Sequence, residues 1–577
     1  MASAGCLTCA PSTRACGGDG FDIVLCRPDG SGLDAVARCD PDQGLVCGGG
    51  SCRNACDVAA TNRSYEGCEY WAVDLDNAVI ADQGAAAAQQ FAVVVTNPLE
   101  VPATVTVEVN DAEPGAPPAV RQVAEAHLAR VVGGGDLAVI NLPAREVDGS
   151  SDPRLNDGPG TWLSSRAYHL RSTAPIIAYQ FNPLDNVDVF SNDASLLLPP
   201  RSLDGDYAVL SWPQTIALTH DPATNFGLNL RTFLTIAGTQ DDTTVDVTLS
   251  TATVPGGPIP VGAPGGVLTF HIGPFDVVNL ETGGFNADFT GSQVHANHPV
   301  VVFAGSEASD VPFFANVAQR YCCADHLEEQ LFPTSSFGTQ FVGVKSPSRT
   351  KYVREAGFDV ALKNDEPEYW RVLAVRDGTD ITTTLLPPNN HFSLSAGQFV
   401  TFVSIEDFVV QASRPIAFAQ FPASQDTTGI RFVAGKRVPG GDPSSIMIPP
   451  IEQWRSKYVF LVPNKYAFDF VLIAMPVTSA LRFDGDDLQT ALPRCEYVSA
   501  GSLILGGASM PTELLAVRCP LSNPTADDLE NPANQNDGRH VLESSDGQTF
   551  GLVVWGWDSY VSYGYPGGTN TRTINIE

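Results

Sequence analysis

Apolar and polar residues alternate with a period of two along many short stretches of this chain, as they do in half-buried β-strands. Residues Ala103 to Val109 alternate in this way, and with Phe91 to Thr96 they predict a first strand pair joined by a turn at Pro98. Helical periodicity is confined to two short stretches, Ala85 to Gln90 and Val123 to Arg130. The pattern therefore predicts an all-β fold.

Sequence landmarks recur at intervals of about 115 to 135 residues, which indicates internal repeats. One landmark is a proline followed by an apolar run with an aromatic residue, and the other is a proline that precedes an aromatic residue by eight positions. The first occurs at Pro175, Pro299 and Pro415, and the second at Pro199, Pro333 and Pro450.

Within each period the strands are expected to form two short antiparallel meanders. The clearest strands are Phe233 to Ala237, Thr244 to Leu249, Val267 to His271, Phe275 to Leu280, Trp370 to Val375, Asp380 to Leu385, His391 to Leu394 and Gln398 to Ser404. Repeated four-stranded meanders favour a β-propeller-like ring, and tandem β-sandwich modules are the alternative. In a closed ring, Tyr70 to Leu75 would lie close to the segment from Phe550 to Ile576.

Cysteines divide the chain into two parts. Nine of the 13 cysteines fall within the first 68 residues, a density typical of small modules held by disulfides in an oxidising compartment. A zinc site at Cys6 and Cys9 is the alternative, but no second pair with this spacing follows. We therefore expect a disulfide-held module at 1–62 and a repeated β region at 63–577. Cys495 and Cys519 are expected to bond to each other.

The charge and the cysteines indicate an extracellular protein. A formal net charge of −32 repels phosphate backbones, so nucleic acid is excluded as a partner. No apolar run is long enough for a transmembrane helix, and the first residues lack the features of a signal peptide. If the protein is secreted, its signal peptide is absent from this sequence.

Acidic pairs are candidates for binding Ca²⁺, a hard cation that prefers oxygen ligands. The candidate ligands are Asp74 and Asp76 in one stretch and Asp484 and Asp486 in another. Neither stretch matches an EF-hand loop, so both are alternatively turns, with the acidity serving solubility. No other cofactor is expected.

Catalytic motifs do not emerge from the sequence. Asp325 and His326 lie beside Cys322 and Cys323, but adjacent cysteines in an oxidising compartment are expected to be oxidised rather than catalytic. The neighbouring carboxylates Glu328 and Glu329 would point to opposite faces of a strand and could not flank one bond. No catalytic residue is therefore assigned.

Three stretches together resemble bacterial proteins that carry the IgGFc-binding protein N-terminal domain. They are Gly67 to Asp76, Asp325 to Leu331 and Ser562 to Gly568. The resemblance spans about residues 63 to 577 and implies a β-rich extracellular binding or adhesion module, with no catalytic residues to carry over.

The expected function is that of a secreted or surface-displayed, non-enzymatic binding or adhesion protein that recognises an extracellular protein or glycan. Loops on a rigid β scaffold commonly carry such recognition. One alternative is an extracellular carbohydrate-active enzyme, because related β folds host glycosidases. The other is a structural subunit of a surface layer or filament, assembled through free sheet edges.

Overall fold

The computed structural model describes residues 8–80, 84–99, 101–128, 136–184, 190–218, 228–320, 323–431, 437–505, 508–529 and 531–575. Cys6 and Cys322 lie outside these residues. Strands dominate the described chain, and every strand pairing is antiparallel, which confirms the all-β prediction. Within the same ranges, no helix is long and apolar enough to cross a membrane.

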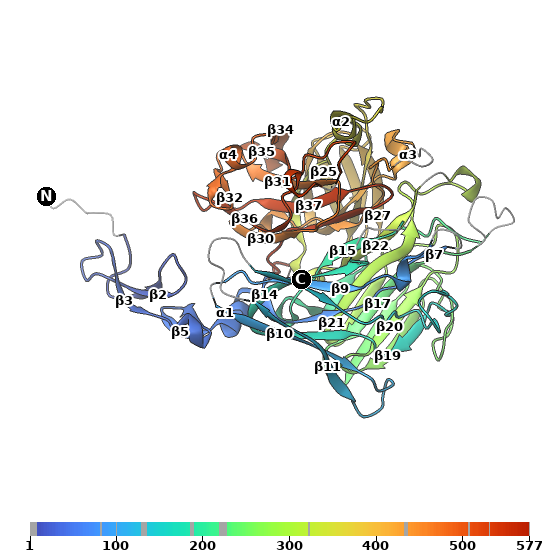
Figure 1. The fold of residues 1–577 in the computed structure, drawn as a ribbon, viewed down its shortest axis with the longest axis horizontal. Helices are drawn as coiled ribbons and strands as arrows, with labels where there is room; N and C mark the ends of the chain where they lie inside the picture. The colour runs from blue at the N-terminus through green and yellow to red at the C-terminus, as the bar shows by residue number, and fades with distance from the viewer. Residues whose placement is uncertain are drawn as a thin grey trace.

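The strands form four successive sheet units, which we call units 1 to 4 (Figure 1). Unit 1 contains β6 Gly67–Ala72, β9 Ala92–Thr96, β10 Ala103–Asn110, β11 Val120–Leu128, β12 Leu137–Asn141, β14 Tyr168–Asn182 and β15 Asp193–Leu196. Unit 2 contains β16 Asp204–Ala208, β17 Thr232–Gly238, β18 Thr243–Thr248, β19 Val267–Ile272, β20 Val277–Glu281, β21 Gln293–Ser309 and β22 Asp325–Gln330, joined by β13 Trp162–Ser164 from the preceding linker.

Units 3 and 4 continue the series. Unit 3 contains β23 Gly338–Gly343, β24 Glu368–Ala374, β25 Thr379–Thr383, β26 His391–Leu394, β27 Phe399–Ser404, β28 Phe408–Pro422 and β29 Ile446–Met447. Unit 4 contains β30 Lys457–Val462, β31 Phe468–Pro476, β32 Leu481–Phe483, β33 Asp486–Asp487, β34 Glu496–Leu505, β35 Ala508–Pro520, β36 Gly538–Ser544, β37 Gly551–Trp557 and β38 Ser562–Pro566. The predicted repeat period therefore corresponds to one sheet unit.

A long strand lies at the centre of units 1 to 3 and joins two halves of each sheet. In unit 3, β28 pairs with β23 and β25 before Pro415, and with β24 and β29 after it. Pro175 in β14 and Pro299 in β21 occupy the equivalent place. Proline cannot donate to a strand ladder, so it marks the point where the long strand passes from one half-sheet to the other. In unit 4 this strand is divided into β36 and β37.

This strand order differs from simple meanders. In unit 3 the order is β26-β25-β28-β24-β27, so consecutive strands are often not neighbours. A β-propeller blade pairs each strand with the next along the chain, and the observed order does not show that arrangement. The units nevertheless meet closely through their last strands: β15 contacts β22 and β38, and β38 contacts β29. β15 and β22 lie between the upper and lower bodies of Figure 1.

The two ends of the β region lie together. Ser64 forms a β-bridge with Asn570, and the Tyr65 amide donates to the carbonyl of Thr569 at 3.1 Å. The two ends of the β region therefore meet immediately before β6, and Tyr70 to Ala72 within β6 pair with β14.

The N-terminal segment is a small disulfide-rich structure that projects from the rest (Figure 1). Its strands are β1 Arg14–Cys16, β2 Asp22–Cys26, β3 Leu33–Arg38, β4 Leu45–Gly48 and β5 Ser51–Asn54, followed by helix α1 Ala55–Asn62. Its disulfides are Cys9–Cys26, Cys16–Cys47 and Cys39–Cys52, and Cys56–Cys68 links α1 to β6. A disulfide-rich N-terminus is therefore confirmed.

Candidate metal centre

The four aspartates predicted as calcium ligands lie in different surroundings. Asp74 is buried, and its Oδ2 accepts a hydrogen bond from the Arg145 amide at 2.7 Å. Asp484 Oδ2 lies 2.8 Å from His540 Nδ1, and Asp484 Oδ1 accepts from the Val541 amide at 2.8 Å. Asp486 is exposed on β33. Of the four, only Asp76 joins a group of carboxylates in the described structure.

Asp76 lies at the centre of five carboxylates, which we call the Asp76 cluster. The other members are Glu281 at the end of β20, Glu307 in β21, and Glu146 and Asp148 in the linker between β12 and β13. Ligand oxygens of Asp76, Glu281 and Glu307 lie within 4.8 Å of one another, as do those of Asp76, Glu146 and Asp148. No member is more than 5% exposed. The cluster therefore joins unit 1, its linker and unit 2.

Donors reach four members of the cluster but not Asp76. Glu307 accepts from the Arg231 amide at 2.7 Å and from Asn156 Nδ2 at 2.8 Å. Glu281 accepts from Asn279 Nδ2 at 3.0 Å, and Asp148 from the Ser150 amide at 2.8 Å. The Asn77 amide approaches Glu146 at 3.4 Å. Both carboxylate oxygens of Asp76 are buried and accept from no amide, hydroxyl or guanidinium group in the described ranges. A hydrogen bond between Asp76 and Glu146 or Glu281 requires a proton on one of the two carboxyl groups.

Burial controls the protonation of this cluster. It raises the pKa of Asp76, Glu146 and Glu307 well above the ordinary range for carboxyl groups, and it raises the pKa of Glu281 to about 7. Repulsion between the neighbouring carboxylates adds to the effect. The five groups cannot all be ionised in this space unless a cation or protons offset their charge.

Two glycines let the linker approach the cluster. A Cβ placed on Gly160 would lie 1.8 Å from Glu281 Oε2, and one on Gly158 would lie 2.5 Å from Asp148 Oδ2. Gly160 also has a φ of +80°, a conformation that suits glycine. The linker is thus shaped around the carboxylates and shields them from solvent.

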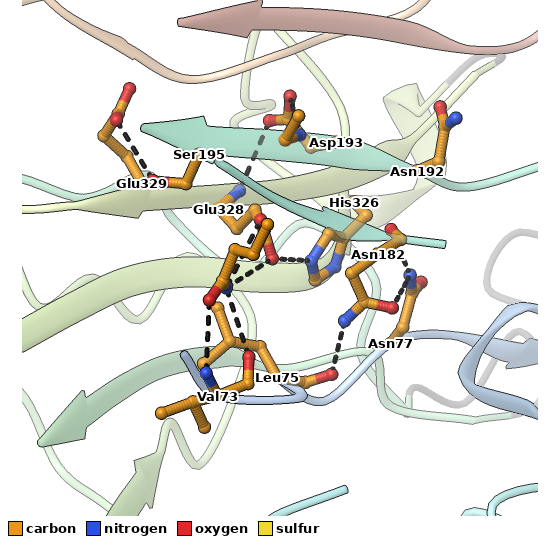
Figure 2. Close-up of polar contacts among 12 residues, drawn as sticks. Val73, Leu75, Asn77, Asn182, Asn192, Asp193, Ser195, His326, Glu328 and Glu329 are labelled. Atoms are coloured by element: carbon orange, nitrogen blue, oxygen red, sulfur yellow. Dashed lines mark hydrogen bonds and ion pairs between the residues drawn. The ribbon is translucent and has the colours of Figure 1, made fainter. Parts of the chain in front are cut away.

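A second set of buried polar groups, which we call the central core, lies on β14, β15 and β22, where units 1 and 2 meet (Figure 2). Glu328 faces Gln180 and His326, whereas Glu329 points away from them toward Ser195, as expected for neighbours on one strand. Asp193 accepts from the amides of Ala194 and Gly564 through one oxygen and from those of Glu328 and Ser445 through the other.

This central core brings together the three stretches on which the family resemblance rests. Gln180 bonds both the amide and the carbonyl of Val73, which lies in the first stretch. Asp325 in the second stretch accepts from the amide of Ser562 in the third at 3.0 Å. These stretches therefore join the sheet units to one another.

Together these features define a disulfide-bonded protein built from repeated antiparallel sheets around a buried polar core. Residues 193–556, which run from β15 into β37, match the family described as IgGFc binding protein. Because the match covers more than half of the chain, the chain belongs to this family.

The human IgGFc-binding protein is 26% identical to this chain over 327 residues. The aligned region is 55% of this chain but 5% of the human protein, so the chain spans only a small part of that relative. No solved structure matches the chain. The comparisons do not show a bacterial origin.

Proposed function

We propose that this chain is an extracellular, non-enzymatic protein that binds another protein. Membership of the IgGFc-binding protein family is the observation that carries the proposal. The disulfides Cys9–Cys26, Cys16–Cys47, Cys39–Cys52, Cys56–Cys68 and Cys495–Cys519 support an oxidising compartment. The comparisons give no support to a glycan ligand, so we propose a protein ligand.

A polar groove between units 2 and 3 is the surface that we propose for this ligand. It encloses about 550 Å³ and is lined by Asp206, His295 and Arg376 among others. Asp206 and His295 form an exposed pair at 2.6 Å. Arg376 lines the groove, and its guanidinium is a donor suited to a carbonyl or carboxylate of a ligand.

The first ligand to test is the Fc fragment of immunoglobulin G, because the human relative is named for binding it. The full chain would be titrated over immobilised Fc in a biosensor, with immobilised Fab as the control surface. Saturable binding to Fc alone would support the proposal, and Arg376→Ala should weaken that binding by about tenfold or more if the groove holds the ligand. Arg414→Ala, on a neighbouring part of the surface, is the matched control.

The same material distinguishes the two other functions. If the purified chain hydrolyses a polysaccharide and substitution of one carboxylate abolishes this activity, the protein is an enzyme and not a binding protein. Concentration-dependent assembly into long polymers during size-exclusion chromatography would favour a structural subunit. Absence of binding to Fc would exclude Fc as the ligand.

A further inference from the structure

The charges around the Asp76 cluster do not balance. Five carboxylates lie there, and two arginines are nearby. The Arg231 guanidinium lies 3.6 Å from Glu281 Oε2. Arg166 lowers the pKa of Asp148 through its positive charge, and its guanidinium donates to the carbonyl of Glu146. Asp74 is a further carboxylate nearby, and its negative charge raises the pKa of Glu146. The excess of negative charge is enclosed by protein, where water cannot screen it.

Three other carboxylates that are buried or largely buried each have an arginine partner that offsets the charge. Asp310 binds Arg320 at 2.6 Å, and Asp288 binds Arg371 at 2.6 Å. Asp407 is paired with Arg518. The fold therefore places an arginine beside these carboxylates but leaves the Asp76 cluster with more carboxylates than guanidinium groups.

Asp325 is a buried carboxylate that is satisfied by backbone amides instead of an arginine. Asp325 accepts from three amides, those of Asn192, His326 and Ser562, at 2.8 to 3.0 Å. Asp76, at 1% exposure, accepts from no amide, hydroxyl or guanidinium group on either oxygen in the described part of the chain, although both oxygens are buried. Its carboxylate is directed at the oxygens of its four neighbours, a position suited to a bound cation.

We propose that the Asp76 cluster binds a Ca²⁺ ion through carboxylates of Asp76, Glu146, Asp148, Glu281 and Glu307. The two overlapping ligand groups contain oxygen donors and neither histidine nor cysteine, which favours a hard cation over zinc. Ca²⁺ takes six to eight oxygen ligands in flexible geometry, and a buried cluster of five carboxylates can supply most of them. The ion joins the segment that follows β6 and the linker of unit 1 to β20 and β21 of unit 2.

Calcium binding by the full chain tests the site directly. Chelator-treated protein would be titrated with CaCl₂ by isothermal calorimetry, and thermal unfolding would be followed in CaCl₂ and in EGTA. We expect one ion per chain and an unfolding midpoint that rises with free calcium above the dissociation constant. If the folded wild-type chain binds no calcium and its midpoint does not change up to about 1 mM, the range of weak extracellular sites, the proposal is wrong.

Asp76→Asn tests the assignment of the ligands, because it removes a charge with little change of volume. The variant should lose the calcium response, and in EGTA it should melt at or above the wild-type temperature, since it relieves repulsion. A purely structural role for Asp76 would instead lower the midpoint in both solutions. Asp484→Asn, at a partly exposed aspartate, is the control and should keep the full response. Unchanged calcium affinity in Asp76→Asn would overturn the site.

Discussion

Three tyrosines in different units donate equivalent hydrogen bonds to backbone carbonyls of, or next to, the long strands. Tyr70 donates to the carbonyl of Ile176, Tyr207 to that of Val300 and Tyr458 to that of Phe550, at 2.5 to 2.7 Å. Ile176 and Val300 directly follow the prolines that divide β14 and β21. Each hydroxyl therefore satisfies a carbonyl at a point where the strand ladder is interrupted. In unit 3 the corresponding residue is Phe341, which has no hydroxyl.

Tyr207→Phe should lower the free energy of unfolding by about 1 to 3 kcal/mol, because it leaves the buried Val300 carbonyl without this donor. Tyr207→Ala, which also removes the ring, should cost more, roughly 3 to 5 kcal/mol. Urea denaturation of both variants and the wild type measures the difference. Equal stability of Tyr207→Phe and the wild type would show that the hydroxyl contributes nothing.

Glu328 is expected to make the free energy of unfolding depend on pH. Burial raises its pKa well above the ordinary range, and Asp193, Glu329 and Asp74 raise it further, while Gln180 lowers it. The neighbouring His326 stays neutral, because burial lowers its pKa to about 3. A raised carboxyl pKa stabilises the fold at acidic pH, and this contribution is lost as the pH rises through the folded-state pKa.

The free energy of unfolding of Glu328→Gln should therefore increase relative to that of the wild type as the pH rises. The free energy of unfolding would be measured at pH 5 and pH 8 in urea, and the difference between variant and wild type should increase toward pH 8. Glu113→Gln, at an exposed position, should show no such change. A difference that shrinks toward pH 8 would contradict the assigned direction.

The sequence revealed only one residue of the Asp76 cluster. Asp76 was found because it lies two positions from Asp74, a local signal for a calcium ligand. Glu146, Glu281 and Glu307 are separated from it by at least one strand, and each is surrounded in sequence by residues typical of strands or turns. Their convergence depends on the packing of unit 1 against unit 2, which a local pattern does not contain.

The strands themselves were largely predictable. Strand-like runs bounded by turn residues located β17, β19, β24 and β26 to within two residues at either end. β19 and β26 alternate between more and less exposed positions, whereas β17 and β24 are buried along nearly their whole length. The order of the strands differs from the predicted meanders, since the long central strands pair with different partners on either side of a proline. The possible helix at Val123 to Arg130 was wrong over its described part, which lies in β11.

The short helices were missed for a related reason. Helix α1 and helix α2 Arg349–Glu355 are only two turns long and carry too few residues to establish helical periodicity. Their N-caps are nevertheless visible: Asn54 accepts from the Cys56 amide and Ser348 from the Lys351 amide. These capping residues were the available sequence signal.

The disulfide between Cys495 and Cys519 joins the start of β34 to the end of β35, across 24 residues. Closing a loop of this length restricts the unfolded chain, so the double substitution Cys495→Ala and Cys519→Ala should lower the free energy of unfolding by about 2 to 4 kcal/mol. Chemical denaturation without reductant measures the loss. In the presence of reductant, the variant and the wild type should differ less, because the wild-type disulfide is then also open.

At the scale of the whole molecule, the C-terminal segment contacts all four units. Beyond the bridge to Ser64 in front of unit 1, Thr571 Oγ1 donates to Ser202 in the turn η3 Pro200–Ser202. The amides of Ile574 and Asn575 donate to the carbonyl of Ser335 in η6 Thr334–Ser336. Gln453, at the end of η7 Ile451–Gln453, bonds Asn570 and Arg572.

These turns directly precede the first strands of units 2, 3 and 4. The C-terminal segment therefore links the points at which the chain enters each of these units. Its backbone bonds with Arg63 and Tyr65 complete the contact with unit 1. Deleting residues 569–577 removes several hydrogen bonds at about 1 kcal/mol each and should cost roughly 3 to 6 kcal/mol of unfolding free energy. Because each unit loses a contact, the thermal transition of the entire β region should move to lower temperature.

Hydrogen exchange distinguishes stabilisation of all four units by the C-terminal segment from stabilisation of unit 4 alone. In the truncated chain, amides of β14, β21, β28 and β37, one long strand from each unit, should all exchange faster than in the full chain. Asn575→Ala is a milder comparison, because it removes only the side-chain bond to the Thr334 carbonyl and should affect the entrance of unit 3. If truncation accelerates exchange in unit 4 alone, the segment is a local extension of β38 and the units are held together by their central strands instead.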